Sequence, residues 1–95
     1  MKSILQKDET KCFLCGKNGG YWGLDVHHVW GASFKKKSEE YGLLVKLCHD
    51  TCHLGGVHKD ASINRKLKAF AQKRAMEHHN LTIEEFIKLF GKNYL

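Results

Sequence analysis

Several features that are common in exported, membrane-bound or low-complexity chains are absent from these 95 residues. The sequence contains no proline, no low-complexity run, no internal repeat and no linker, so we expect one domain. No apolar stretch approaches the roughly 18 residues that a membrane span needs. The polar segment 1–11 also lacks the apolar region of a signal peptide. We therefore expect a cytoplasmic protein with no membrane partner.

Acidic residues are scarce relative to basic ones. Ten Asp and Glu stand against sixteen Lys and Arg, which gives a net charge of +6. This balance favours a polyanionic partner, with nucleic acid before an anionic membrane surface. The sequence predicts no particular oligomeric state. The candidate contacts to phosphate groups are Lys35, Lys36, Lys37, Arg65 and Lys66. The other interpretation of these residues is a solvated loop and a solvated helix face.

Four cysteines form two short-range pairs, Cys12 with Cys15 and Cys48 with Cys52. In a reducing compartment, such pairs indicate a metal site more often than disulfides. Tetrahedral zinc is commonly held by four thiolates that lie on tight turns. The pattern therefore predicts a structural Zn²⁺ on all four cysteines. The alternatives are two disulfides, buried free thiols, or a ligand set in which His49 or His53 replaces one cysteine.

A second group of candidate residues is rich in histidine. His27 and His28 are neighbours in a predicted strand, and adjacent strand residues point to opposite faces. Either one of them is exposed to solvent, or both flank a cleft. His53 follows Cys52 directly, and His58 comes soon after it. If the four cysteines share one zinc ion, these four histidines converge beside it.

The order of the predicted elements indicates a small α+β domain with a β-hairpin, a zinc knuckle and two C-terminal helices. Alternation and helical periodicity predict strands over 24–29 and 43–47, one helical turn over 38–41, a compact turn over 48–58, and helices over 60–79 and 83–90. Segment 1–11 is expected to be a loose or weakly helical lead-in. Phe70 is expected in the core between the last two helices, and Trp22 in the core or against the knuckle.

The motifs together resemble a known enzyme family. Cys-x-x-Cys, then Asp-x-His-His-Val, then Leu-Cys-x-x-x-Cys-His is similar to the HNH endonucleases of the ββα-metal, or His-Me finger, superfamily. The runs HHVWG, SEEYGLLVKLCHDTCH, VHKDA and FIKLFGKNYL resemble small phage-encoded HNH proteins of Gram-positive bacteria. The resemblance implies an N-terminal lead-in over 1–11 and a single zinc-knuckle nuclease domain over 12–95.

This resemblance implies a metal-dependent endonuclease that hydrolyses phosphodiester bonds of DNA. It makes His28 the general base, and it makes His27 and His53 ligands of a catalytic metal. By the same resemblance, His58 is a third ligand or a contact to the scissile phosphate, and Asp25 orients a histidine or completes the metal's coordination shell. A histidine-rich site suits Zn²⁺, Ni²⁺, Co²⁺ or Mn²⁺ better than Mg²⁺, which remains possible if Asp25 and water supply oxygens. The implied setting is phage DNA packaging or recombination in a bacterial host cell.

The sequence departs from the family pattern at two places. The central Asn of the HNH name has no clear counterpart between His28 and Cys48, where Ser33 or Ser38 could stand. The pair Gly55-Gly56 interrupts the place where the α-element of the family begins. Two further hypotheses are a non-catalytic, zinc-stabilised module that binds nucleic acid and a protein-interaction module. The intact histidine set favours the nuclease, because a binding module needs no base beside a metal site.

Overall fold

Two antiparallel strands form the centre of the structure. In the computed structural model, which describes residues 3–95, β1 (Leu24–His28) pairs with β2 (Leu44–Cys48), with Leu24 opposite Cys48 and His28 opposite Leu44. Val45 and Leu47 of β2 are fully buried, as expected for alternate residues on the inner face of a strand. The predicted hairpin is therefore confirmed: β1 ends one residue earlier than predicted, and β2 begins and ends one residue later.

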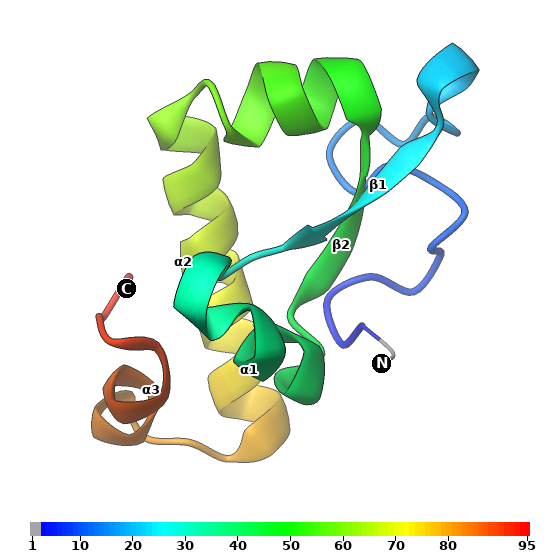
Figure 1. Ribbon diagram of the computed structural model, residues 1–95. Coiled ribbons are helices and arrows are strands. Elements are labelled where there is room, and N and C mark those ends of the chain that lie inside the picture. Colours follow the sequence, from blue (N-terminus) through cyan, green and yellow to red (C-terminus); the bar gives the residue numbers. More distant parts are fainter. Residues whose placement is uncertain (1–2) are drawn as a thin grey trace.

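Beside this hairpin the described residues form four helices of seven or more residues, in addition to two short 3₁₀ turns (Figure 1). They are α1 (Lys35–Tyr41), a π-helix (His49–Val57), α2 (Ala61–His79) and α3 (Ile83–Phe90). The π-helix follows β2 directly, and α2 then runs back past the hairpin with α3 against its far end (Figure 1). The predicted small α+β fold, with a hairpin, a four-cysteine cluster and two C-terminal helices, is confirmed.

Helix α1 lies in the connection between the strands and is longer than the predicted single turn. It ends at Gly42, whose φ of 73° lies in the left-handed region that glycine adopts without strain. Inside it, the Ser38 hydroxyl donates to the Trp30 carbonyl at 2.7 Å and accepts from the Trp30 N–H at 3.2 Å. Ser38 is completely buried, so these bonds fix α1 to the segment that follows β1.

The caps of the last two helices agree with the sequence signals. The Asp60 side chain accepts a hydrogen bond from the Ser62 N–H at the start of α2. Thr82 and Glu85 form the predicted capping box at the start of α3. These caps satisfy backbone groups that the helix starts leave unpaired, and so they set where α2 and α3 begin.

The core is centred on aromatic residues between α3 and the hairpin. The Trp30 ring lies 5.3 Å from the Phe86 ring and 4.9 Å from the Phe90 ring, measured between centroids. One aromatic prediction was wrong: Phe70 is 40% exposed because Leu67 and Ala71 provide the buried face of α2, and its ring packs on Phe13 instead. Trp22, expected in the core or against the knuckle, is 64% exposed and so lies outside the core. Its ring lies 6.1 Å from that of His49, which stands between the knuckle cysteines Cys48 and Cys52.

The segment expected as a compact turn after Cys48 is instead the π-helix. Its hydrogen bonds join residues five apart, as in the bond from the His58 N–H to the His53 carbonyl at 3.2 Å. Gly55 makes this winding possible, because a Cβ atom there would lie 2.9 Å from the Asp50 carbonyl oxygen. The periodicity of the sequence gave no sign of this element, since π-helices are rare.

The described part of the lead-in, residues 3–11, contains no helix or strand and is packed against the hairpin. Ser3 and Leu5 are buried, and the Ile4 N–H donates to the Gly42 carbonyl at 2.9 Å. The Gln6 side chain accepts from the Lys46 N–H of β2 at 2.8 Å. This segment is not loose, because it covers the free edge of β2, whose backbone groups need partners. Within residues 3–95, none of the helices is both long enough and apolar enough to span a bilayer.

Candidate metal centres

The four cysteines come together at the end of the hairpin. One sulfur from each of Cys12, Cys15, Cys48 and Cys52 lies within 4.8 Å of the others. The Sγ atoms of Cys15 and Cys48 are 3.4 Å apart, and tetrahedral zinc with bonds of 2.3 Å places its sulfurs about 3.8 Å apart. The donor set and the spacing therefore fit a structural Zn²⁺.

The environment of the cluster separates the pKa values of its thiols. Burial alone would raise the pKa of Cys12, but backbone N–H groups, first that of Cys15, donate to its sulfur and hold the pKa at about 6. Burial raises the pKa of Cys52 to about 12 and also raises the pKa of Cys48. At neutral pH the Cys12 thiol is therefore largely ionised, whereas Cys48 and Cys52 keep their protons. A bound Zn²⁺ would displace those protons and offset the negative charge of the thiolates that result.

The alternative ligand sets find no support in the structure. None of the four cysteines forms a disulfide, which contradicts the two-disulfide alternative. The alternative of buried free thiols does not fit Cys15, which is exposed, or Cys52, which is half-buried. His49 and His53, the proposed substitutes for a cysteine, both direct their Nδ1 atoms at the Asp25 carboxylate.

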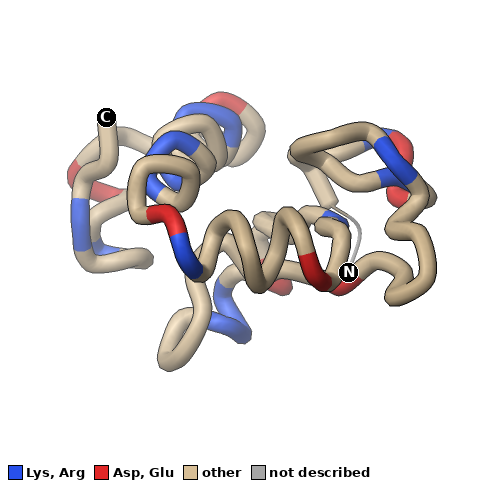
Figure 2. The backbone as a smooth tube through the Cα atoms, turned by 90° about the horizontal axis from the view of Figure 1, so that it is seen from above, with Lys and Arg blue, Asp and Glu red and all other residues tan. Residues whose placement is uncertain are grey.

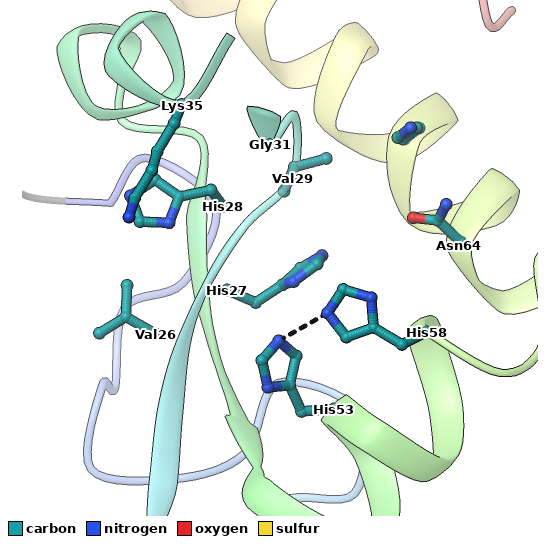
Figure 3. A pocket seen from close by; sticks show the side chains of 10 residues that line it. Val26, His27, His28, Val29, Gly31, Lys35, His53, His58 and Asn64 are labelled. Carbon is teal, nitrogen blue, oxygen red and sulfur yellow. Dashed lines mark hydrogen bonds between the residues drawn. The ribbon is translucent and has the colours of Figure 1, made fainter. Parts of the chain in front are cut away.

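Three histidines form a second cluster next to the first. One ring nitrogen from each of His27, His53 and His58 lies within 4.8 Å of the others. The Nε2 atoms of His53 and His58 are 3.0 Å apart, and Figure 3 shows the three rings turned toward one another. Zinc with nitrogen ligands at 2.0–2.1 Å needs nitrogen separations of about 3.3 Å. The trio could therefore hold one metal ion.

The π-helix accounts for the pairing of His53 with His58. In an α-helix, residues five apart lie about 140° from each other around the axis, on different faces. The i to i+5 bond from the His58 N–H to the His53 carbonyl instead stacks the two residues on one face. Gly55 therefore does not interrupt the site, because it permits the winding that places His58.

His27 supplies the strongest sign that the trio fits a cation. It is 7% exposed, and its Nε2 atom is buried with no hydrogen-bond partner among the described residues. Burial, followed by the neighbouring His53 and His58, lowers the pKa of His27 to about 4. The ring is therefore neutral at pH 7 and keeps a lone pair for coordination. A buried polar atom without a partner costs roughly 1–3 kcal/mol, and a metal bond to it would offset that cost.

Asp25 orients the histidine at the centre of the trio. Its Oδ2 atom accepts from Nδ1 of His53 at 2.8 Å and from Nδ1 of His49 at 2.7 Å. These bonds, first the one from His53, hold the pKa of Asp25 below its usual range despite partial burial. With its proton on Nδ1, His53 presents the Nε2 lone pair toward His58. Of the two predicted roles of Asp25, these hydrogen bonds fit the first, orientation of a histidine. His49, considered from the sequence only as a substitute zinc ligand, is instead a second partner of Asp25.

His28 projects from the other side of β1, yet it borders the same cavity as the trio (Figure 3). This cavity has a volume of about 350 Å³. Of the two alternatives left by the sequence, both neighbouring histidines flank a cleft. The His28 Nε2 atom lies 2.9 Å from Oε1 of Glu39, a residue that the sequence did not single out.

The predicted phosphate contacts are dispersed, and one of them lies at the cavity. Lys35 lines it, whereas the Lys37 Nζ atom donates to the Leu89 carbonyl at 3.0 Å. Lys36 and Arg65 are exposed outside the cavity lining, and Lys66 borders a separate apolar pocket. Figure 2 shows Lys and Arg on several separate segments, with acidic residues between them.

Helix α2 adds two cavity residues, Lys68 and Asn64, of which sequence reasoning did not assign Asn64 to the site. They are one turn apart on one face of α2. Helical spacing after the Asp60 cap, close to His58, is the signal that could have identified Asn64. A positively charged side chain thus lies on each of two walls of the cavity, Lys35 from α1 and Lys68 from α2.

The chain matches no family model, no curated protein and no solved structure. The arrangement itself is consistent with a ββα-metal fold, since it combines a β-hairpin, a helix that follows it, a four-cysteine cluster and a histidine cluster.

Proposed function

We propose that this protein is a metal-dependent DNA endonuclease that uses an HNH mechanism. One observation carries the proposal: three histidines that fit a metal ion converge on a cavity that a fourth, His28, also borders. A purely structural metal site would have no need for an additional imidazole at the same opening. The net charge of +6 and the two lysines at the cavity agree with a polyanionic substrate.

The trio His27, His53 and His58 would hold the catalytic metal, with Asp25 keeping His53 in its ligating tautomer. When bound there, a divalent cation supplies charge that polarises the phosphate and stabilises the leaving 3′-oxygen. Nitrogen ligands favour Zn²⁺, Ni²⁺, Co²⁺ or Mn²⁺ over Mg²⁺. The four cysteines hold the structural Zn²⁺, which fixes the start of the π-helix and with it His53.

His28 acts as the general base. It takes a proton from a water molecule, and the resulting hydroxide forms a new bond to phosphorus while the bond to the 3′-oxygen breaks. Lys35 and Lys68 flank the substrate phosphates and offset their charge without reading sequence. A role in phage DNA packaging or recombination, inside a bacterial host cell, is supported by the sequence resemblance.

The test is cleavage of supercoiled plasmid. Protein that keeps its structural zinc would be stripped of other metals and then supplied with Mn²⁺, Ni²⁺, Co²⁺, Zn²⁺ or Mg²⁺. His28→Ala removes the base, and His78→Ala is the matched control because His78 is an exposed histidine outside the cavity. We expect metal-dependent cutting by the wild-type and His78→Ala proteins, and a loss of roughly 10²- to 10⁴-fold in His28→Ala.

No cutting with any metal, by protein shown to be folded, would reject the nuclease. Salt-dependent DNA binding without cutting would then favour the nucleic-acid-binding module. Absence of both cutting and binding would favour the protein-interaction module.

A further inference from the structure

We propose that Glu39 is the positioning residue for His28, an inference that rests on His28 being the base of the proposed nuclease. The Nε2 atom of His28 lies 2.9 Å from Oε1 of Glu39, within hydrogen-bond distance. The two residues come from different elements, since His28 ends β1 and Glu39 lies in α1.

The pairing determines which nitrogen of His28 can act. An ionised carboxylate only accepts hydrogen bonds, so the proton of the neutral ring resides on Nε2. The hydrogen bond from His28 holds the pKa of Glu39 below its usual range, which keeps the carboxylate ionised. Nδ1 is then the free proton acceptor of the ring. After proton transfer, the carboxylate also stabilises the imidazolium. This is the relation of base and orienting carboxylate found in hydrolytic triads.

The fold fixes Glu39 relative to His28 through its neighbour in sequence. Ser38 is fully buried, and its hydroxyl bonds both backbone groups of Trp30, two residues beyond His28. The Ser38 carbonyl also accepts from the Leu43 N–H at 2.8 Å, just before β2. Helix α1 is therefore attached to both ends of the connection between the strands. Glu39 therefore cannot move relative to His28 unless the buried hydrogen bonds of Ser38 break. A precisely positioned base needs support of this kind.

Solvent limits how much the charge of Glu39 can contribute. Its side chain is 50% exposed, whereas that of His28 is 16% exposed. An exposed ion pair contributes little to folding, so substitution of Glu39 should leave the protein folded. Orientation of the ring is then the main effect, and the expected loss of rate is roughly tenfold, at the lower end of the range for residues that orient active groups.

The experiment compares single-turnover cleavage of supercoiled plasmid with Mn²⁺ by the wild-type protein and three variants. Glu39→Ala should lower the maximal rate constant about tenfold. It should leave unchanged the protein concentration for half-maximal cleavage, the dissociation constant for Mn²⁺ and the melting temperature. Glu39→Gln keeps an acceptor oxygen without the charge and should lose less. Glu40→Ala, an exposed neighbour in α1, should cut as wild type does.

A double-mutant comparison separates positioning from a general structural effect. If Glu39 acts through His28, Glu39→Ala should cause no further loss in a His28→Ala background. An equal loss in both backgrounds would overturn the inference. So would wild-type cleavage by Glu39→Ala, or ¹⁵N NMR of the His28 ring that places the proton on Nδ1. If the wild-type protein does not cut with any metal, the proposed function itself fails. Unaffected Glu39→Ala beside an active wild type refutes only the role of Glu39.

Discussion

The two candidate metal centres share a boundary, because Cys52 and His53 are consecutive residues of the π-helix. The cysteine centre offers four soft ligands, which complete a tetrahedral shell. The histidine centre offers three ligands beside a cavity of about 350 Å³. Structural zinc sites are closed, whereas catalytic sites keep an open position for water or substrate. This difference agrees with the proposed division of roles, in which the cysteine centre stabilises the fold and the histidine centre carries the chemistry.

Loss of the cysteine centre should have the largest effect, because this centre is proposed to stabilise the whole fold. Cys48→Ser removes one thiolate from a zinc site of a type that contributes about 10–16 kcal/mol to folding in zinc-finger peptides. That exceeds the typical net stability of a small domain, about 5–15 kcal/mol. We expect no cooperative thermal transition by circular dichroism. A melting temperature equal to that of wild type would show that the centre is not structural.

Loss of a histidine ligand should instead leave the stability of the fold almost unchanged and reduce cleavage. His58 is exposed, so His58→Ala should melt within a few degrees of wild type. Plasmid cleavage should fall by roughly 10²- to 10³-fold, because a metal supplies several kcal/mol of transition-state stabilisation. His78→Ala serves as the control for removing an imidazole. Retained cleavage in His58→Ala would remove His58 from the ligand set.

Acid should also distinguish the two centres. The pKa of His27 is lowered from an ordinary 6.5 to about 4. Between these two pH values His27 is protonated in the unfolded chain but remains neutral in the folded chain. In protein stripped of the cavity metal, stability should fall by roughly 3 kcal/mol between pH 6.5 and pH 4 from this residue alone. Above pH 6.5 it should contribute no pH dependence.

Denaturant unfolding of wild type and His27→Gln across this pH range measures the His27 contribution, since acid loss of zinc affects both proteins. His27→Gln should show the flatter dependence. Equal slopes for the two proteins would contradict the account.

A smaller effect is expected from the carboxylate that orients His53. Asp25→Asn should weaken binding of Mn²⁺ or Ni²⁺ at the histidine centre about 10- to 100-fold, with the structural zinc retained. Isothermal titration calorimetry measures the affinity, and saturating metal should restore most of the cleavage. Asp50→Asn is the matched control, because Asp50 is an exposed residue in the first turn of the same π-helix. Equal affinities for both variants would assign Asp25 no role at this centre.

Local sequence signals predicted the hairpin, the cysteine cluster and the caps of α2 and α3, because each depends on residues close together in the chain. The convergence of His27 with His53 was also expected from the shared zinc. The π-helix was not predicted, since its winding depends on contacts such as that between Gly55 and the Asp50 carbonyl. The partners His49 and Glu39 escaped prediction for the same reason, as their roles arise only when the strands and helices pack.

The most direct test of the central claim links metal occupancy to cleavage. Protein with one tightly bound zinc would be titrated with Mn²⁺ or Ni²⁺, and plasmid cleavage would be followed together with the bound metal per chain. The account predicts negligible cutting with the structural zinc alone and activity that rises and saturates as a second equivalent binds, with no such rise in His58→Ala. Full activity with one zinc per chain, or no activity with two metals bound, would contradict it.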